Sequence, residues 1–427
     1  MRQSWLRFDA ILLLTVIALM LFGLAMIYSA TSFPSYQDGA LLNLPFVRQA
    51  LVGLIGLASV FILAAIDYEV LGYHPLAVLS PITRQRQEPA GLGLALHHEQ
   101  YSKVEREEHG SSIKGIILLF IEALTNPFYM LSLVLLVAVT LLGWSAGGSQ
   151  RWINLGLFDV QPSEVAKLLV IIAMARYLAD HEDTIDHIRH LLVTMLQVAI
   201  PMLMIARQPD LGTALTLGAI WIGMIVMAGA PWRHLILLAL MGAAAAPVAW
   251  LRFLTDYQRE RLLIFLNPQL DPLGAGYNII QSRISVGAGG LLGRGLNSGT
   301  QSQLHFLRIQ HTDYIFSVLG EEMGFVGSTI VIVLYVVLIM QILTIASQSR
   351  DTFGRLLAYG MGAMLVFQVF VNIGMNIGLS PVTGIPLPFI SYGRSSLLTL
   401  LLCVGILESI ARRRKREEDL ATSHVVA

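Results

Sequence analysis

The chain is poor in charge and nearly free of cysteine. Only 13% of its 427 residues are charged, whereas a soluble globular protein carries about 25%. The single cysteine, Cys403, excludes an internal disulfide framework. Basic and acidic residues are equal at 28 each, so no overall positive charge indicates nucleic-acid binding. These shortages exclude a disulfide-rich secreted domain and disfavour an ordinary soluble protein.

Long apolar runs account for the low share of charged residues. Apolar residues make up 55% of the chain, more than one soluble core can bury. Arg2 and Arg7 before the first run also fit a signal peptide, but no convincing small-residue cleavage site follows. The sequence therefore predicts an all-α, polytopic integral membrane protein with about ten spans. The runs lie near residues 11–28, 50–66, 129–143, 165–178, 191–206, 211–228, 235–254, 314–346, 356–377 and 388–410.

Basic residues near the ends of the chain predict its orientation. Arg2 and Arg7 precede the first run, and "ARRRKREED" follows the last. An even number of spans puts both termini on one side, and the positive-inside rule makes that side cytoplasmic. The polar stretches with the most distinctive residues then all face outward. They are residues 147–164, 206–213, the large extracytoplasmic loop 253–311 between spans seven and eight, and 378–396.

The domain organisation predicted is one transmembrane domain over residues 1–427 with a cytoplasmic insert. Residues 69–114 mix charge with Pro, Gly and Ser, so we expect a solvated loop between spans two and three. The histidines of this insert fit no metal-site spacing, and segment 181–190 is interpreted as a second solvated connector. Residues 411–427 form a basic cytoplasmic tail.

Ionisable residues near or within apolar runs are costly, so they usually line a cavity or pair with one another. Glu164 and Lys167 share one helical face at spacing i, i+3. They either hold each other or present Lys167 to an anionic ligand. Asp210 opens the sixth span, where it is a helix cap or a site residue. Of the adjacent Glu321 and Glu322, we expect one to be an interior hydrogen-bonding anchor.

The glycine-rich stretch "NPQLDPLGAGYNIIQSRISVGAGGLLGRG" (267–295) is unusual in so apolar a chain. It lacks the "GK[ST]" of a phosphate-binding loop and the strand–turn–helix context of a dinucleotide site. Asp271 precedes a proline and glycines, which indicates a turn. Tyr277, Ile280 and Ile284 then predict one face of a short amphipathic helix at the membrane surface. Asp271 alone fits either a turn cap or a functional carboxylate.

Several motifs in this order resemble the SEDS family of bacterial cell-wall synthesis, which includes RodA, FtsW and SpoVE. They are "RWINLG…QPSEVAKL", "QPDLGTAL", "DPLGAGYNIIQSRISVGAGGLLGRG", "GTQSQLHFL…HTDYIFSVLGEE" and "GIPLPFISYG". The resemblance covers nearly the whole chain and is closer to RodA, the elongation member, than to FtsW, the division member. Two features depart from the family: the long insert, which could bind a partner, and Arg394 where many members have a second glycine. A bulky cation there could alter loop packing or add a phosphate contact.

The resemblance implies a ten-helix peptidoglycan glycosyltransferase. Members polymerise lipid II on the outer face of the cytoplasmic membrane, together with a class B penicillin-binding protein and other cell-elongation proteins. Asp271 matches the family's catalytic aspartate, and Trp152 matches an important outer-loop tryptophan. The resemblance makes seven residues candidates for substrate binding. These are Arg151, Trp152, Glu164, Lys167, Asp210, Gln281 and His311.

The chemistry of such a reaction fits an outward carboxylate. Attack of a sugar 4-hydroxyl on an α-linked lipid pyrophosphate inverts the anomeric carbon and benefits from one general base, here Asp271. Pyrophosphate is a good leaving group, so it needs positive charge rather than a second acid. Arg151, Lys167, another loop arginine or a divalent cation (Mg or Mn) would supply it; no nucleotide or organic cofactor is expected. A lipid II flippase, a catalytically idle scaffold and the division member stay as alternatives.

Overall fold

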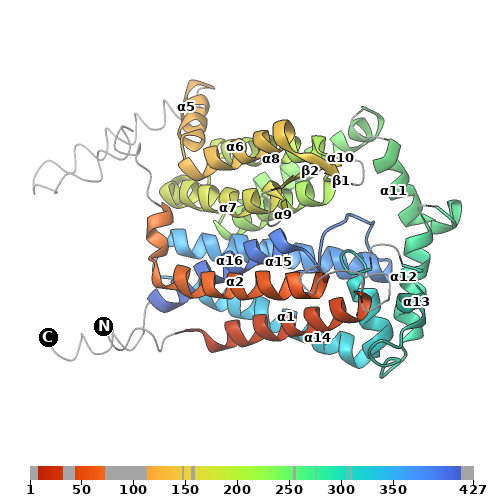
Figure 1. Cartoon of the computed structure of the whole chain (residues 1–427). Coiled ribbons are helices and arrows are strands. Elements are labelled where there is room, and N and C mark those ends of the chain that lie inside the picture. Colours follow the sequence, from red (N-terminus) through yellow and green to blue (C-terminus); the bar gives the residue numbers. More distant parts are fainter. Residues whose placement is uncertain are drawn as a thin grey trace, which may run out of the picture.

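The computed structural model describes residues 8–31, 44–72, 113–146, 149–154, 159–252, 256–274, 276–304, 306–307 and 310–414. Long helices form the body of this part, and each corresponds to one predicted apolar run (Figure 1). They are α1 (Ala10–Thr31), α2 (Pro45–Ala65), α6 (Pro127–Leu142), α7 (Pro162–Asp180), α8 (Ile188–Arg207), α9 (Leu211–Met227), α10 (Trp232–Arg252), α14 (Ile315–Ser347), α15 (Thr352–Ile377) and α16 (Arg394–Arg413).

These helices differ in how well each would cross a bilayer alone. Among the described residues, six are long and apolar enough, namely α1, α2, α8, α14, α15 and α16. A seventh is α6 if it counts with α5 (Ile113–Leu124), to which it is bent by 73°. The rest of the ten are shorter or more charged: α9 has 17 residues, and α7 contains the pair Glu164 and Lys167. The fold is that of a polytopic membrane protein.

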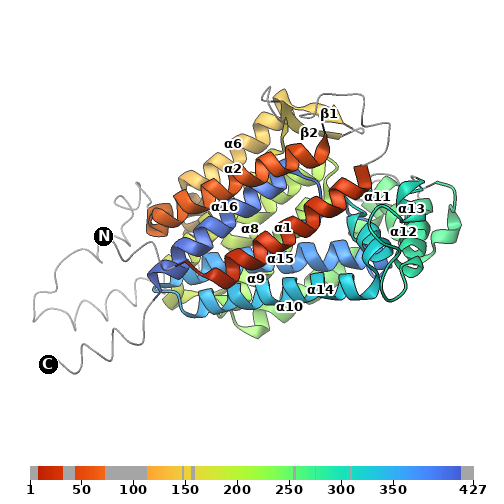
Figure 2. The same ribbon diagram turned by 60° about the horizontal axis from the view of Figure 1, so that its bottom comes forward.

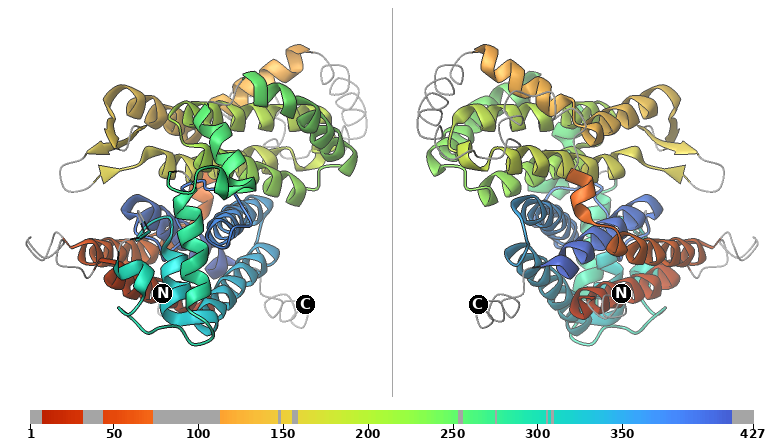
Figure 3. Two further views of the ribbon diagram at one scale, coloured as in Figure 1. Left: turned by 90° about the vertical axis from the view of Figure 1, so that its right-hand side faces the viewer. Right: turned by 90° about the vertical axis from the view of Figure 1, so that its left-hand side faces the viewer.

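The helices form two groups that α15 joins. Helices α6 to α9 pack together in one group, and α1, α2, α14 and α16 pack in the other, as the end-on views of Figure 3 show. Helix α15 contacts α7 and α9 as well as α14. Small residues permit this close packing: a Cβ added to Gly223 of α9 would lie only 2.5 Å from the Cβ of Ala363 in α15.

The structure adds a small sheet to the helical fold that the sequence predicts. Three short strands, β1 (Trp144–Ala146), β2 (Ser149–Asn154) and β3 (Asp159–Val160), pair antiparallel in the order β1-β2-β3. They lie between α6 and α7, where the first predicted outer stretch begins. A short hairpin satisfies its own backbone groups there, so the chain need not continue as helix.

The large loop between α10 and α14 contains helices of its own. They are α11 (Asp256–Leu266), the 3-10 helix η6 (Pro268–Leu270), α12 (Tyr277–Ala288) and α13 (Thr300–Gln303). Figures 1 and 2 both place α11, α12 and α13 at the same end of the molecule as β1 and β2. We call this the loop end of the bundle.

The short helix predicted after Asp271 exists as α12, but it packs through a different face. Its buried residues are Ile279, Ser282 and Ser285, and it contacts α14 and α15. The hydroxyl of Ser282 donates to the carbonyl of Asn376 at 2.7 Å, while Ile284 is 45% exposed. Hydrogen bonds to neighbouring helices, rather than the apolar face alone, therefore position α12.

Close backbone contact explains the glycines that follow α12. Helix α14 is broken at Gly324, whose φ is 66°, and segment 290–295 pairs with the break. Four backbone hydrogen bonds of 2.9–3.1 Å join the two, from Arg294 and Gly295 to α14 and from Phe325 and Val326 to the segment. A Cβ on Gly293 would lie 2.5 Å from the carbonyl carbon of Glu322. We call this pairing the clasp (residues 289–295 with 321–326).

Much of the predicted insert lies outside the described residues. Its first residues belong to the 3-10 helix η3 (Tyr68–Gly72) and its last to α5, while residues 73–112 are not described. The end of α16 covers the start of the predicted basic tail, whose residues 415–427 are likewise outside the described part.

Candidate active site

Contacts at the loop end bring the four predicted polar stretches together. Arg151 of β2 donates to the carbonyl of Gln208 at 3.0 Å, which joins the hairpin to the segment before α9. Arg261 of α11 donates to the carbonyl of Val382 at 3.1 Å, which joins the large loop to the segment between α15 and α16. The backbone N–H of Gln161 donates to the hydroxyl of Ser395 at 3.0 Å, which joins these two pairs of stretches. Residues far apart in sequence thus form one polar region. This arrangement is the one expected if they line a common site.

Arg151 and Asp210, both predicted to bind substrate, lie close together. The Nη1 atom of Arg151 lies 3.8 Å from Oδ2 of Asp210, and its Nη2 donates to the carbonyl of Pro209. Asp210 also caps α9, since its Oδ1 accepts from the backbone N–H of Thr213 at 3.1 Å. Gln161 donates to its Oδ2 at 3.2 Å. Asp210 is therefore a helix cap through one oxygen, and its other oxygen contacts Gln161 and Arg151. A role in substrate binding stays a prediction.

Glu164 and Lys167 form a closed buried pair in the first turns of α7. Lys167 Nζ donates to Oε1 of Glu164 at 2.8 Å, and the Lys167 and Glu164 side chains are only 2% and 5% exposed. A buried ion pair with one partner missing is strongly unfavourable, so each residue holds the other in place. A role toward an anionic ligand stays a prediction and would require the pair to open.

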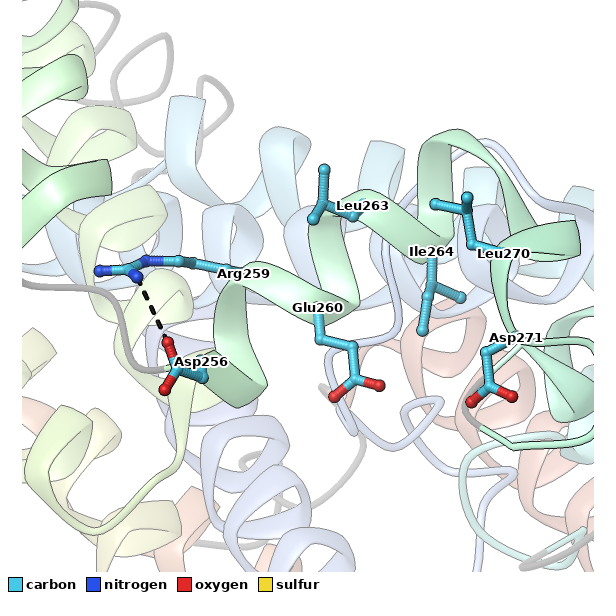
Figure 4. A pocket seen from close by; sticks show the side chains of 7 residues that line it. All are labelled: Asp256, Arg259, Glu260, Leu263, Ile264, Leu270 and Asp271. Atoms are coloured by element: carbon cyan, nitrogen blue, oxygen red, sulfur yellow. Dashed lines mark hydrogen bonds and ion pairs between the residues drawn. The ribbon is translucent and has the colours of Figure 1, made fainter.

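Asp271 follows η6 and lines a pocket of about 420 Å³ at the loop end. Figure 4 shows the carboxyl groups of Glu260 and Asp271 pointing to the same side of the α11–η6 segment. Arg151 and Lys167 are not among the residues that line this pocket. Its lining consists of Asp256, Arg259, Glu260, Leu263, Ile264, Leu270 and Asp271. The pocket thus combines apolar walls with acidic groups.

The turn that presents Asp271 depends on its glycines. Oδ1 of Asp271 accepts from the backbone N–H of Gly274 at 3.0 Å, and its carbonyl accepts from Gly276 at 3.0 Å. A Cβ on Gly274 would lie 2.7 Å from the carboxyl carbon of Asp271. The carboxylate is therefore a turn cap that also lines a pocket, and the turn fixes its direction.

The remaining candidates lie around this region in different environments. His311 is partly buried beside the ring of Tyr392, with ring centroids 5.6 Å apart, and burial lowers the pKa of His311. A neutral imidazole is thus favoured. Trp152 pairs across the hairpin with Trp144 and is partly exposed. Gln281 of α12 is also partly buried; nothing in the structure places it toward the pocket.

Several polar residues of this region were not found from the sequence. Asp313, Arg261, Gln161 and Glu260 all belong to it through their contacts or the pocket they line. Gln161 and Asp313 stand in the motifs "QPSEVAKL" and "HTDYIFSVLGEE", which could have indicated them. Arg261 and Glu260 carry no such signal, because their grouping arises only in space.

Three residues that the sequence did single out are structural anchors. Arg394, noted for its departure from the family, forms an ion pair of 3.1 Å with Asp159 and so fixes the start of α16 against β3. Both Glu321 and Glu322 are buried anchors, where the sequence predicted only one. Glu321 accepts from the N–H of Gln301 at 2.9 Å, and Glu322 accepts from the hydroxyl of Ser29 at 2.6 Å.

The donor set at the loop end sets limits on a metal ion. Among the described residues, no three or more His, Cys, Asp or Glu side chains come together as a metal site. The Asp271 pocket offers the carboxylates of Glu260 and Asp271. Mg²⁺ is commonly held by one or two carboxylates with substrate phosphates completing its shell. The described residues therefore form no complete protein cage, and a divalent cation shared with the substrate's phosphates stays a prediction.

The fold and site define a class: a polytopic membrane protein with a pocket at one end of its helices that combines apolar walls with acidic side chains. The profile of the family described as "Cell cycle protein" (FtsW, RodA and SpoVE) matches residues 113–416. The chain belongs to this family, as the motifs predicted.

Relatives and solved structures resemble the chain over most of its length. It is 41% identical over 315 residues to the peptidoglycan glycosyltransferase MrdB of Escherichia coli K12, covering 72% of this chain and 85% of MrdB. It is 41% identical over 286 residues to stage V sporulation protein E of Bacillus subtilis 168, covering 67% and 76%. The crystal structure of Thermus thermophilus rod shape determining protein RodA has 26% identity and a TM-score of 0.60, covering 97% and 99%. A chain of a peptidoglycan synthase complex reaches 29% and 0.73, covering 97% and 100%.

Proposed function

We propose that this protein is a peptidoglycan glycosyltransferase that polymerises lipid II on the outer face of the bacterial cytoplasmic membrane. The observation that carries the proposal is the pocket at the loop end, where a fixed turn presents Asp271 beside Glu260. The resemblance to relatives named peptidoglycan glycosyltransferases supports it. With both termini cytoplasmic, the loop end faces outward, where lipid-linked precursors are polymerised.

Asp271 is the general base in this proposal. Its carboxylate takes the proton from the sugar 4-hydroxyl as the oxygen attacks the anomeric carbon of the growing chain. The bond from that carbon to the lipid pyrophosphate breaks, and the β-linkage forms with inversion. The hydrogen bond from Gly274 N–H to Oδ1 holds the carboxylate in one direction, which favours proton transfer at a fixed position.

Positive charge is needed where pyrophosphate leaves. Arg151 lies in the polar region beside Asp210, and Lys167 lies deeper in α7. A divalent cation, Mg²⁺ or Mn²⁺, bound at Glu260 together with the substrate's phosphates would neutralise part of the developing charge. The seven candidate residues keep their proposed roles in substrate binding, with His311 acting as a neutral group.

The proposed partner is a class B penicillin-binding protein, together with other proteins of cell elongation. The resemblance to a peptidoglycan synthase complex supports this assembly. The match to MrdB, 41% over 315 residues, supports elongation over division, since the match to the FtsW of Trichlorobacter lovleyi is 36%, although over a longer stretch of 415 residues.

Reconstitution tests the proposal against the flippase alternative. The protein in liposomes with its penicillin-binding protein, lipid II and Mg²⁺ should yield glycan polymer. Movement of fluorescent lipid II across the bilayer, measured by dithionite quenching in the same liposomes, should not exceed that of empty liposomes. Flipping without polymer would refute the enzyme assignment.

A further inference from the structure

The C-terminal end of α10 depends on hydrogen bonds from outside the helix. The last carbonyls of an α-helix have no partner within it, and those of Trp250 and Leu251 lie in the last turn of α10. Pro247 lies one turn earlier, and a proline inside a helix removes a backbone donor. Among the described elements, α10 makes no extensive contact with another helix, and its Leu240 is 64% exposed. Neighbouring helices therefore give this end of α10 little support.

Arg259 of α11 supplies the missing hydrogen bonds. Its Nε donates to the carbonyl of Trp250 at 2.9 Å, and its Nη2 donates to the carbonyl of Leu251 at 3.2 Å. Its Nη1 donates to Oδ1 of Asp256, at the start of α11, at 3.3 Å (Figure 4). A cation is also favoured at the C-terminus of a helix by the helix dipole. All three guanidinium nitrogens thus donate within the protein, and two of them join α11 to α10.

This link acts on the segment that carries Asp271. Every residue that lines the pocket belongs to α11 or η6, except Asp271, which directly follows η6. Helix α11 also packs against η6. Figure 4 shows Glu260 and Asp271 on the same side of this one segment. A rotation of α11 would therefore turn both carboxylates of the pocket.

A second arginine holds α11 from another direction. Arg261 donates to the carbonyl of Val382, in the segment between α15 and α16, at 3.1 Å. Two positions along an α-helix correspond to about 200° around its axis, so Arg259 and Arg261 leave α11 on nearly opposite sides. Two anchors on opposite sides fix the orientation of a helix. Without the bonds of Arg259, α11 could pivot about the anchor at Val382.

We propose that Arg259 is a positioning residue that holds α11 against the end of α10 and so fixes the direction in which Asp271 faces. The inference rests on the proposed function, in which Asp271 is the general base. A small displacement of a catalytic group lowers the rate strongly, even when the substrate is still bound. Arg259 acts through α11 and does not touch the substrate.

Distances between spin labels test the link without requiring activity. Leu240→Cys and Leu266→Cys place one label on α10 and one on α11, at side chains that are 64% and 76% exposed. The native Cys403 is buried and should not react. Double electron–electron resonance on the full chain in lipid nanodiscs then gives the distribution of distances between the two helices.

The variants separate the hydrogen bonds of Arg259 from its charge. Arg259→Gln removes both, whereas Arg259→Lys keeps the charge and a donor group. Arg252→Gln is the matched control: Arg252 lies in the last turn of α10, and its side chain makes no hydrogen bond or ion pair with the other described residues. The turnover number and Michaelis constant for lipid II are measured for each variant without labels.

The expected pattern combines a structural and a kinetic change. In Arg259→Gln the distribution of label distances should broaden or shift, and the turnover number should fall about tenfold. The Michaelis constant should stay within about twofold of wild type, because no substrate contact is lost. Arg259→Lys should lie between wild type and Arg259→Gln in both measurements, and Arg252→Gln should match wild type.

Two results would overturn the inference. The first is a wild-type distribution of label distances in Arg259→Gln. The second is a raised Michaelis constant with an unchanged turnover number, which would make Arg259 a substrate contact instead. A changed distance distribution in Arg259→Gln, together with a wild type that makes no polymer, would confirm the link between the helices and refute the proposed enzyme function separately.

Discussion

The clasp makes a prediction that separates two costs of replacing a glycine. Gly293 and Gly290 both have positive φ, 81° and 55°, but a Cβ would meet α14 only at Gly293. An added Cβ on Gly293 would lie 2.5 Å from the carbonyl carbon of Glu322, whereas nothing lies within 4 Å of one on Gly290. Alanine at Gly290 therefore measures the cost of backbone strain alone, and alanine at Gly293 measures that cost together with the loss of close contact.

The magnitudes follow from the geometry. The left-handed conformation costs an alanine about 1–2 kcal/mol at either position. Gly293→Ala also separates the segment from α14 and weakens the hydrogen bonds from Arg294 and Gly295, at about 1 kcal/mol each. The free energy of unfolding should thus fall by roughly 3–4 kcal/mol for Gly293→Ala and by roughly 1–2 kcal/mol for Gly290→Ala.

Thermal unfolding in detergent, followed by tryptophan fluorescence, measures the difference. Hydrogen exchange of the amides of residues 325 and 326, which donate into the segment, reports the clasp directly. Protection there should fall in Gly293→Ala and stay near wild type in Gly290→Ala. Equal destabilisation by the two substitutions would refute the reasoning, because it would show that the close contact between Gly293 and α14 contributes nothing to stability.

Other predictions concern the buried pair, α12 and His311. Lys167→Met should lower the free energy of unfolding by about 3–5 kcal/mol, because it leaves the Glu164 carboxylate buried alone. Adding Glu164→Gln should recover most of this loss. Chemical unfolding measures both variants, and a double variant as unstable as Lys167→Met would contradict the pairing. Ser282→Ala should cost about 1–2 kcal/mol, since it removes its bonds to Ser317 and Asn376; unchanged melting would contradict that role. Burial lowers the pKa of His311, so stability should be full above about pH 6.5 and fall as pH decreases below it. A pH series of melting temperatures should show a smaller acid loss in His311→Gln than in wild type; equal slopes would be evidence against it.

The helices could be predicted from the sequence because each apolar run is a local signal. The hairpin is harder to find, although residues 147–148 are Gly-Gly between two short segments, a pattern that permits a two-residue turn. The prediction of a solvated connector at 181–190 holds for its middle and is wrong for its ends. His181 and His190 are 8% and 1% exposed, with rings 4.7 Å apart. Their burial depends on the packing of α7 against α8, which no local pattern reveals.

The residues of the candidate site likewise divide into those that the sequence could predict and those that it could not. Asp271, Arg151 and Asp210 stand in motifs and could be named in advance. Arg261 and Glu260 stand in none of these motifs and could not be named in advance, because they join the region only through contacts in space. The role of Gly289 and Gly293 cannot be found from composition either, because it depends on their close contact with the backbone of α14 near Gly324.

Polymerisation by Asp271→Asn tests the central claim most directly. Asn keeps an Oδ1 that can accept the Gly274 N–H, now at 3.0 Å, so the turn should survive. Wild type and variant, each with the penicillin-binding protein, are compared for the rate of glycan synthesis from lipid II and for melting temperature. We predict a rate loss of about 10²–10⁴-fold with unchanged melting. A well-folded variant that polymerises at the wild-type rate would show that Asp271 only caps its turn.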